Sequence, residues 1–271
     1  MLFDKKTAVI TGGAGVLCSA FGAMLAREGA RVALLDLNAE AAAQRAAEIE
    51  RAGGRAIGVG CNVLEPASVN AAAKEVADAF GACDFLINGA GGNNPKGSTA
   101  EETYGAGTRT FFDIDSKDFA FVTDLNLLGT VIPTQVFAKQ MLGREGSSIL
   151  NISSMSAPCP MTKVPAYSAA KAGISNLTQW LAVYFADSKI RVNAIAPGFL
   201  ITGQNRALLL NDDGSLTERS RKIISHTPMR RFGQPSELLG AVKFLLNYSE
   251  SAFVNGIVLP IDGGFMAYSG V

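Results

Sequence analysis

The chain has 271 residues, enough for one large α/β domain or two small ones, and either can bury a sizeable core. Lysine plus arginine equals aspartate plus glutamate at 24 each, so no long-range field favours nucleic acid or an anionic membrane as a partner. The 4 cysteines lack paired metal spacing and no apolar stretch is as long as a membrane helix, so we expect a soluble, reduced, cytoplasmic protein without a bound metal.

Short β-branched apolar runs alternate along the chain with alanine-rich segments of helical period. The runs predict strands at residues 7–11, 31–36, 55–63, 83–89, 147–154, 189–198 and 256–264. Strands that alternate with helices are typical of right-handed crossovers and a parallel sheet covered on both faces. No linker, composition break or fixed repeat divides the chain. We therefore predict the α/β class, with a single Rossmann-type doubly wound domain over 1–271 and about seven parallel strands.

Two polar segments, 93–117 and 199–226, interrupt this alternation. The first is much longer than the usual connection in a compact domain. Each follows a predicted strand, and open α/β sheets bind ligands at the carboxyl ends of their strands. We interpret both segments as substrate loops.

The stretch "TGGAGVLC" at 11–18 joins the first predicted strand to a helix. Gly12, Gly13 and Gly15 suit a turn whose backbone N–H groups approach a pyrophosphate, and the helix N-terminus adds partial positive charge. A tight turn with no ligand is the alternative. Asp36 tips the balance toward a dinucleotide, because it ends the second strand about two dozen residues after the loop begins, where a carboxylate can accept hydrogen bonds from both hydroxyls of an adenosine ribose.

Asp36 also favours NAD(H) over NADP(H). A 2′-phosphate would meet this carboxylate as a like charge, and neither the glycine turn nor Leu37 and Asn38 offer a cation to offset it. The alternative is that Asp36 only caps the helix that starts near Asn38.

The chemistry is predicted to lie around Tyr167. Lys171 follows four residues later, so both side chains share a helical face, and Ser154 closes the preceding strand. A neighbouring ammonium favours the phenolate and would lower the tyrosine pKa, which makes Tyr167 an acid/base, while the serine hydroxyl can bond a substrate oxygen. The alternative is a surface Tyr–Lys pair without a chemical role. The position of the two residues, after the predicted cofactor half of the chain, disfavours this alternative.

Several motifs resemble, in order, those of the short-chain dehydrogenase/reductase family: "TGGAG", "INGAG", "LNLLG", "NISS", Tyr167 followed by Lys171, and "APGFLIT". The resemblance covers the whole chain and implies a catalytic tetrad of Asn126, Ser154, Tyr167 and Lys171. In this family the lysine also binds the nicotinamide ribose, and the asparagine holds a helix backbone and a water in a proton relay.

The glycine turn, Asp36 and the resemblance together predict the cofactor contacts. They are Gly12, Gly13, Gly15, Val16, Leu17, Asp36, Asn62, Val63, Asn88, Gly89, Ala90, Gly91, Tyr167, Lys171, Pro197, Gly198 and Thr202. The chain departs from the family pattern at Val16 and Cys18, where glycine is usual, and at Gly89, where asparagine is usual. Asn62 replaces a common aspartate near adenine. We expect a turn that is slightly displaced by Val16 yet still binds.

Longer segments, among them "TGGAGVLCSA", "INGAGGNNP", "PGFLITGQNR" and "GGFMAYSGV", resemble the D-mannonate oxidoreductase (fructuronate reductase) branch. This likeness implies interconversion of D-fructuronate and D-mannonate with NAD(H). The candidate substrate contacts are Asn93, Asn94, Lys163, Gln204 and Arg206. Gluconate 5-dehydrogenase or another sugar-acid or polyol ketoreductase is the nearest alternative. A non-catalytic NAD(H) sensor is a second alternative, which the intact tetrad argues against.

Assembly is predicted only through the resemblance. Helices at about 118–142 and 165–187 are similar to those that form the helical interface of family tetramers. We therefore expect a homotetramer, although the sequence leaves a dimer open.

Overall fold

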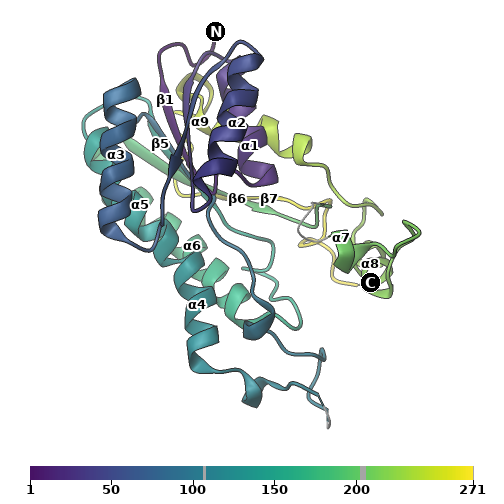
Figure 1. The fold of residues 1–271 in the computed structure, drawn as a ribbon. Helices are drawn as coiled ribbons and strands as arrows, with labels where there is room; N and C mark the ends of the chain where they lie inside the picture. Colours follow the sequence, from purple (N-terminus) through teal and green to yellow (C-terminus); the bar gives the residue numbers. More distant parts are fainter. Residues whose placement is uncertain (106–107, 202–205, 271) are drawn as a thin grey trace.

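A single sheet of seven parallel strands organises the computed structural model, which describes residues 1–271 apart from 106–107, 202–205 and 271 (Figure 1). The spatial order is β3-β2-β1-β4-β5-β6-β7. The strands are β1 (Thr7–Thr11), β2 (Arg31–Asp36), β3 (Arg55–Gly60), β4 (Phe85–Asn88), β5 (Ser147–Ile152), β6 (Ile190–Pro197) and β7 (Val258–Ile261). The predicted fold class, with strands at all seven expected places, is confirmed.

The strand order reverses between β1 and β4. After β1 the chain runs outward through β2 and β3, and it then returns to pair β4 with the other side of β1, with Thr11 opposite Asn88. Crossovers on the two sides of such a point diverge, which leaves a crevice at the carboxyl ends of the two strands. The glycine turn at 12–15 follows β1 at this place.

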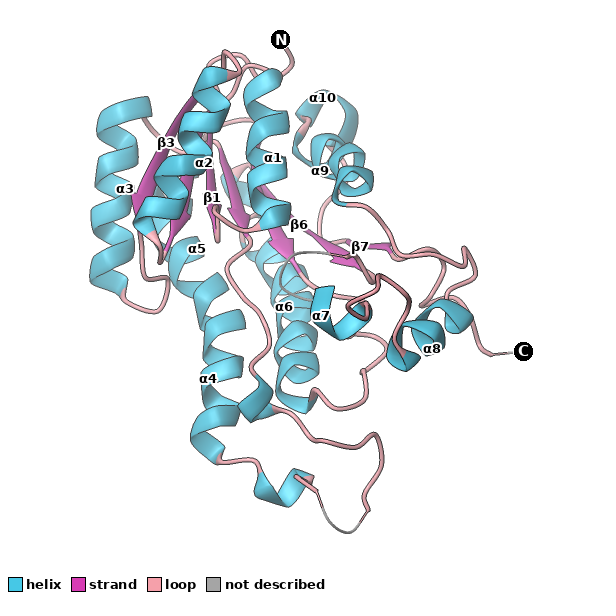
Figure 2. Cartoon of the chain, turned by 45° about the vertical axis from the view of Figure 1, so that its right-hand side comes forward, coloured by secondary structure: helices cyan, strands magenta, loops and turns pink. Residues whose placement is uncertain are grey.

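Helices cover both faces of the sheet (Figure 2). The helices are α1 (Val16–Arg27), α2 (Ala39–Arg51), α3 (Pro66–Phe80), α4 (Ser116–Asn126), α5 (Leu128–Met141), α6 (Pro165–Tyr184), α7 (Arg206–Leu209), α8 (Glu218–His226), α9 (Leu239–Leu246) and α10 (Tyr248–Ser251). One core cluster joins the sheet to α1, α2 and α9, and the second joins it to α3, α5 and α6. Side chains of successive strand residues enter opposite clusters: Ile10 lies in the first and Val9 in the second.

The helix expected at 118–142 is divided at Leu127 into α4 and α5. Asn126, the last residue of α4, is fully buried there. The second predicted helix is confirmed as α6, and a 3-10 turn (Ala186–Ser188) follows it.

The segment 93–117 extends away from the sheet beside α4 (Figure 2). It contains two short 3-10 turns, Pro95–Gly97 and Phe111–Asp113. Arg109 stabilises it internally by donating hydrogen bonds to the Pro95 and Lys96 carbonyl oxygens. An ion pair between Glu102 and Lys222 joins this segment to α8. The two predicted substrate loops therefore contact each other.

No helix among the described residues combines the length and the apolar character needed to cross a membrane.

Candidate active site

The glycine turn packs against the segment that follows β4. The Thr11 hydroxyl accepts hydrogen bonds from the backbone N–H groups of Gly89 (3.1 Å) and Ala90 (3.2 Å). Gly12 has a φ of 65°, and a β-carbon there would lie 2.9 Å from Ala90 Cα. Only glycine satisfies both the conformation and the close approach. The turn therefore keeps its backbone exposed to a ligand while it contacts the neighbouring strand.

Val16 does not strain the turn. It is the first residue of α1, its φ is not positive, and its side chain is 40% exposed. The expected displacement of the turn is thus unnecessary, because a helical residue at this position needs no glycine conformation. Leu17 packs on the core, and the N-cap of α1, Gly15, makes no side-chain capping bond. The first-turn N–H groups of a helix have no partner within the helix and suit an anion.

Asp36 closes the turn from the end of β2. Its Oδ2 accepts a hydrogen bond from the Ala14 N–H (3.1 Å), and its Oδ1 accepts one from the Asn38 N–H (3.0 Å). Asn38 itself is the N-cap of α2, through its side chain. The capping alternative for Asp36 is therefore wrong. The Asp36 carboxylate instead connects the glycine turn to the start of α2.

Asn126 holds the segment after β4 from the other side. Its Nδ2 donates to the carbonyl oxygens of Gly92 (2.8 Å) and Val122 (2.8 Å), and its Oδ1 accepts from the Gly92 N–H (3.1 Å). The break between α4 and α5 places this carboxamide beside Gly92. A β-carbon on Gly91 would lie 2.6 Å from Asn126 Oδ1 and 3.6 Å from Lys171 Nζ.

Ser154 and Tyr167 lie together at the carboxyl end of β5. Burial raises the pKa of the Tyr167 phenol above its ordinary value, and a hydrogen bond with the Ser154 side chain lowers it only in part. The sequence had predicted a lowered tyrosine pKa through Lys171. That prediction is wrong for this structure, because loss of water around the phenolate dominates.

Lys171 is buried with only 5% of its surface exposed. Its Nζ donates to the Ile152 carbonyl oxygen (2.7 Å) and lies 5.5 Å from the centre of the Tyr167 ring, over its face. Burial lowers the pKa of Lys171 to about 8, because a charged ammonium is costly away from water. The two side chains share one face of α6, as the four-residue spacing predicted.

A series of buried side-chain hydrogen bonds, which the sequence analysis missed, connects the strands and helices that carry the site. Asn88 Nδ2 donates to Thr134 Oγ1 and to Asn151 Oδ1, both at 2.9 Å, and Asn151 Nδ2 donates to Thr178 Oγ1 at 2.9 Å. These bonds connect β4 and β5 to α5 and α6. The sequence contained a sign of these hydrogen bonds, because Asn151 is a polar residue within an apolar strand. The Asn88 amide nitrogen thus has a structural role between β4, β5 and α5.

The other predicted cofactor residues lie along the same edge. Asn62 Oδ1 accepts from the Leu64 N–H (3.1 Å), and its amide donates to Glu65 (2.8 Å), so this side chain already orders the turn after β3. Val63 is buried beside α5. Pro197 ends β6, and its carbonyl oxygen accepts from the Met155 N–H (3.1 Å), next to Ser154.

Gly198 and Thr202 complete the predicted cofactor set. A β-carbon on Gly198 would lie 2.6 Å from Asp262 Cα, so no side chain fits between β6 and the segment after β7. Thr202 lies outside the described residues.

The predicted substrate residues are dispersed. Asn94 caps the turn Pro95–Gly97, and Asn93 donates to Ser98 (3.0 Å). Arg206 is exposed at the start of α7, and Gln204 lies outside the described residues. Both asparagines therefore have local structural partners.

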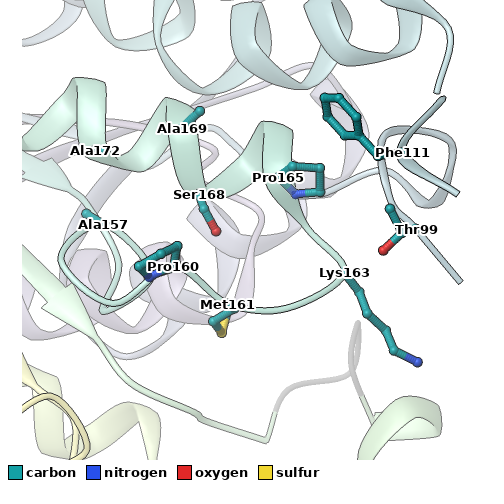
Figure 3. Close-up of a pocket in the computed structure, with 11 residues that line it drawn as sticks. Thr99, Phe111, Ala157, Pro160, Met161, Lys163, Pro165, Ser168, Ala169 and Ala172 are labelled. Carbon is teal, nitrogen blue, oxygen red and sulfur yellow. The ribbon is translucent and has the colours of Figure 1, made fainter. Parts of the chain in front are cut away.

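Lys163 lies at a hollow of about 550 Å³ between the 156–163 loop and α6 (Figure 3). Ser168, Ala169 and Ala172 form its α6 wall, on another face of the helix from Tyr167 and Lys171. In Figure 3 the Lys163 side chain points away from this wall. None of the four tetrad residues lines this hollow, although Ser156, whose N–H donates to Ser154 Oγ, does.

The described residues contain no group of three or more His, Cys, Asp or Glu side chains that could hold a metal ion.

Comparison with known proteins gives consistent matches over the full length. The family model described as enoyl-(acyl carrier protein) reductase matches residues 17–266. A crystal structure from Haemophilus influenzae, provisionally assigned as a D-mannonate oxidoreductase and containing bound NAD, is 56% identical with a TM-score of 0.96, covering 99% of this chain and 97% of that one. An uncharacterized oxidoreductase of Bacillus subtilis, UxuB, is 54% identical over 98% of this chain and 96% of its own. The D-threitol dehydrogenase of Mycolicibacterium smegmatis is 34% identical over 97% and 93%.

The buried lysine predicts a specific pH dependence of stability. The folded protein releases the Lys171 proton near pH 8 and the unfolded chain near pH 10.5, so the unfolded chain binds more protons between these values. Stability relative to K171M should therefore rise as the pH increases from 8 to 10.5, by up to about 3 kcal/mol. Urea denaturation of both proteins at pH 7, 8.5 and 10 measures this. K117M, at an exposed lysine of α4, is the control; a difference for K171M that does not change with pH would contradict the assignment.

Proposed function

Because this chain belongs to the short-chain dehydrogenase/reductase family, we propose that it is an NAD(H)-dependent oxidoreductase interconverting D-fructuronate and D-mannonate. The observation that carries the proposal is that Asn126, Tyr167 and Lys171 converge beside the glycine turn at the point where the strand order reverses. Ser154 completes the group through its hydrogen bond with Tyr167. Such a group can transfer a proton to or from an oxygen atom, and a protein that only binds a ligand does not need it.

The site fits a nicotinamide dinucleotide. Gly12 and Gly13 approach neighbouring backbone and side-chain atoms so closely that a β-carbon would lie within 3.0 Å of them, which keeps the turn bare. We infer that this turn and the first turn of α1 hold the pyrophosphate, and that Asp36 accepts hydrogen bonds from the adenosine ribose. Lys171 would bond the nicotinamide ribose. The bound dinucleotide supplies or accepts a hydride.

The residues of the tetrad provide the proton. The raised pKa of Tyr167 keeps its phenol protonated near neutral pH, so Tyr167 is ready to donate to the oxygen of a ketone. Ser154 bonds the same phenol and can orient a substrate oxygen beside it. In the direction of alcohol oxidation the phenol must first lose its proton, and a charged Lys171 below about pH 8 favours the phenolate.

A sugar acid is the substrate class that the charges around the loops favour. The Lys222 ammonium bonded to Glu102 holds the pKa of that carboxyl below its usual value, and the charges of Lys163 and Arg219 act in the same sense. These three cations thus gather where the segments 93–117 and 199–226 meet. A carboxylate substrate would be attracted to this region, which supports a sugar acid over an uncharged polyol.

We also propose a homotetramer that uses the outer face of α4, α5 and α6. Large apolar side chains are exposed there, including Trp180 at 57% and Val183 at 80%, and Trp180 stacks on Tyr184 at 4.8 Å between ring centres. Exposed apolar groups gathered in this way are typical of subunit interfaces. The four cysteines are unpaired, which fits a cytoplasmic location.

The substrate assignment is tested by nicotinamide absorbance. Purified protein and NADH are mixed with D-fructuronate, 5-ketogluconate or tagaturonate, and we expect turnover to favour D-fructuronate strongly. Y167F should retain NADH affinity and lose at least about 100-fold in kcat, because the phenolic proton is absent. Preference for another keto acid would overturn the substrate, and equal turnover by Y167F would overturn the mechanism.

The role of Asp36 is tested by D36A and D36N. Removing the carboxylate should weaken NADH binding about tenfold and narrow the preference over NADPH, since charge-assisted hydrogen bonds to the ribose are lost. D36N keeps one amide oxygen as an acceptor for the Ala14 N–H, so it separates the charge from the support of the turn. Titration of NADH and NADPH fluorescence measures both constants. A constant NADH/NADPH ratio across the three proteins would contradict the assignment.

The interface proposal is tested by W180E. A charge in the centre of an apolar contact cannot be solvated there, so this variant should elute as a smaller species than the wild type. Size-exclusion chromatography with light scattering gives the mass. F253E, at a fully exposed phenylalanine outside these helices, should keep the wild-type mass. An unchanged mass for W180E, or a monomeric wild type, would rule out this interface.

A further inference from the structure

Cys18 and Gly89 occupy one space between α1 and the end of β4. Cys18 is the third residue of α1 and is buried. A β-carbon built on Gly89 would lie 2.2 Å from Cys18 Sγ, far closer than two such atoms can approach. The thiol therefore fills the volume that a side chain at position 89 would need.

The backbone next to this contact is held from two sides. Thr11 and Cys18 lie against Gly89 on the side of the glycine turn. Asn126 binds both the N–H and the carbonyl oxygen of Gly92 on the side of the tetrad. A shift of the chain at Gly89 would be transmitted over three residues to the Asn126 carboxamide, and Lys171 Nζ lies beside the same segment.

We propose that Cys18 and Gly89 form a matched steric pair, in which Cys18 positions the 89–92 backbone between the glycine turn and Asn126. Cys18 is thus a positioning residue for the turn and for the tetrad. The chain departs from the family pattern at both positions, and the structure explains why the two departures occur together. The Cys18 thiol and a side chain at position 89 do not fit together.

The Cys18 thiol has no role as a nucleophile in this arrangement. Burial and the nearby Asp36 carboxylate raise its pKa to about 12, and nucleophilic chemistry requires the thiolate. Its contribution is its volume. Consequently a smaller residue at position 18 should loosen the packing against Gly89, and a larger residue at position 89 should displace the chain.

The effect on cofactor binding rests on the proposed nicotinamide site, whereas the steric pairing does not. We therefore separate the two by measuring thermal unfolding of the apoprotein and NADH binding by fluorescence. Four proteins form a double-mutant cycle: wild type, C18A, G89A and C18A/G89A. Alanine at 18 removes Sγ and leaves a Cβ that would lie 3.8 Å from the new methyl group, which is an ordinary contact.

We expect G89A to lower the unfolding midpoint by about 3 to 10 °C and to raise the NADH dissociation constant about tenfold, because the overpacked thiol must displace the chain. C18A/G89A should recover about half of both losses. Recovery should be partial, because the Thr11 carbonyl oxygen would still lie 2.9 Å from the added carbon. C18S/G89A keeps an atom at the thiol position and should recover little.

The control for a general glycine-to-alanine effect is G240A. Gly240 is exposed in α9, and its added methyl group would meet no atom within 4 Å. This variant should bind NADH like the wild type and unfold at the wild-type midpoint or slightly above it, because alanine is the better helix former. Additive losses in C18A/G89A, or a G89A protein as stable as the wild type, would overturn the pairing. If the unfolding midpoints of the four proteins show coupling but the wild type does not bind NADH, the pairing is upheld and the proposed cofactor is overturned.

Discussion

The close approach of β1 and β4 at their carboxyl ends is the constraint on which the site depends. Thr11 and Asn88 are paired there. Backbone atoms leave no room for a side chain at Gly12, and the Cys18 thiol and the Thr11 carbonyl oxygen leave none at Gly89. Two consequences follow from one contact. The glycine turn has no side chain facing the crevice, and the segment after β4 lies within hydrogen-bonding distance of Asn126. The position of Asn126 relative to the glycine turn thus depends on close packing at this pair of strands.

The buried charge of Lys171 is the cost of this arrangement. The ammonium has one hydrogen bond to the Ile152 carbonyl oxygen and lies over the Tyr167 ring, and no carboxylate is bonded to it among the described residues. Burial works against the charged forms of both Lys171 and Tyr167. Charging one of them favours charging the other, since they are oppositely charged neighbours. The charged forms of the two side chains therefore favour each other.

The sequence was sufficient for the fold and for predicting which side chains lie together beside the glycine turn. The seven strands have a clear apolar pattern, and the Tyr167–Lys171 spacing fixes a shared helical face whatever the tertiary structure. Electrostatic effects were not predictable in the same way. The pKa of Tyr167 depends on how much water reaches it, and this depends on elements distant in sequence. The link between Cys18 and Gly89 was also hidden, because the two residues are 71 positions apart and meet only through the strand pairing.

On the proposed function, substrate selection would arise outside the sheet and the glycine turn. On that function, the tetrad would act on any carbonyl that reaches it, so discrimination would fall to the segments beyond the strand ends. In this chain those segments are joined by the Glu102–Lys222 ion pair, with Lys163 and Arg219 close enough to act on the same carboxylate. Both partners of the ion pair are partly exposed, so it contributes little to stability. It instead joins the two segments at a place where Lys163 and Arg219 also act on the Glu102 carboxylate.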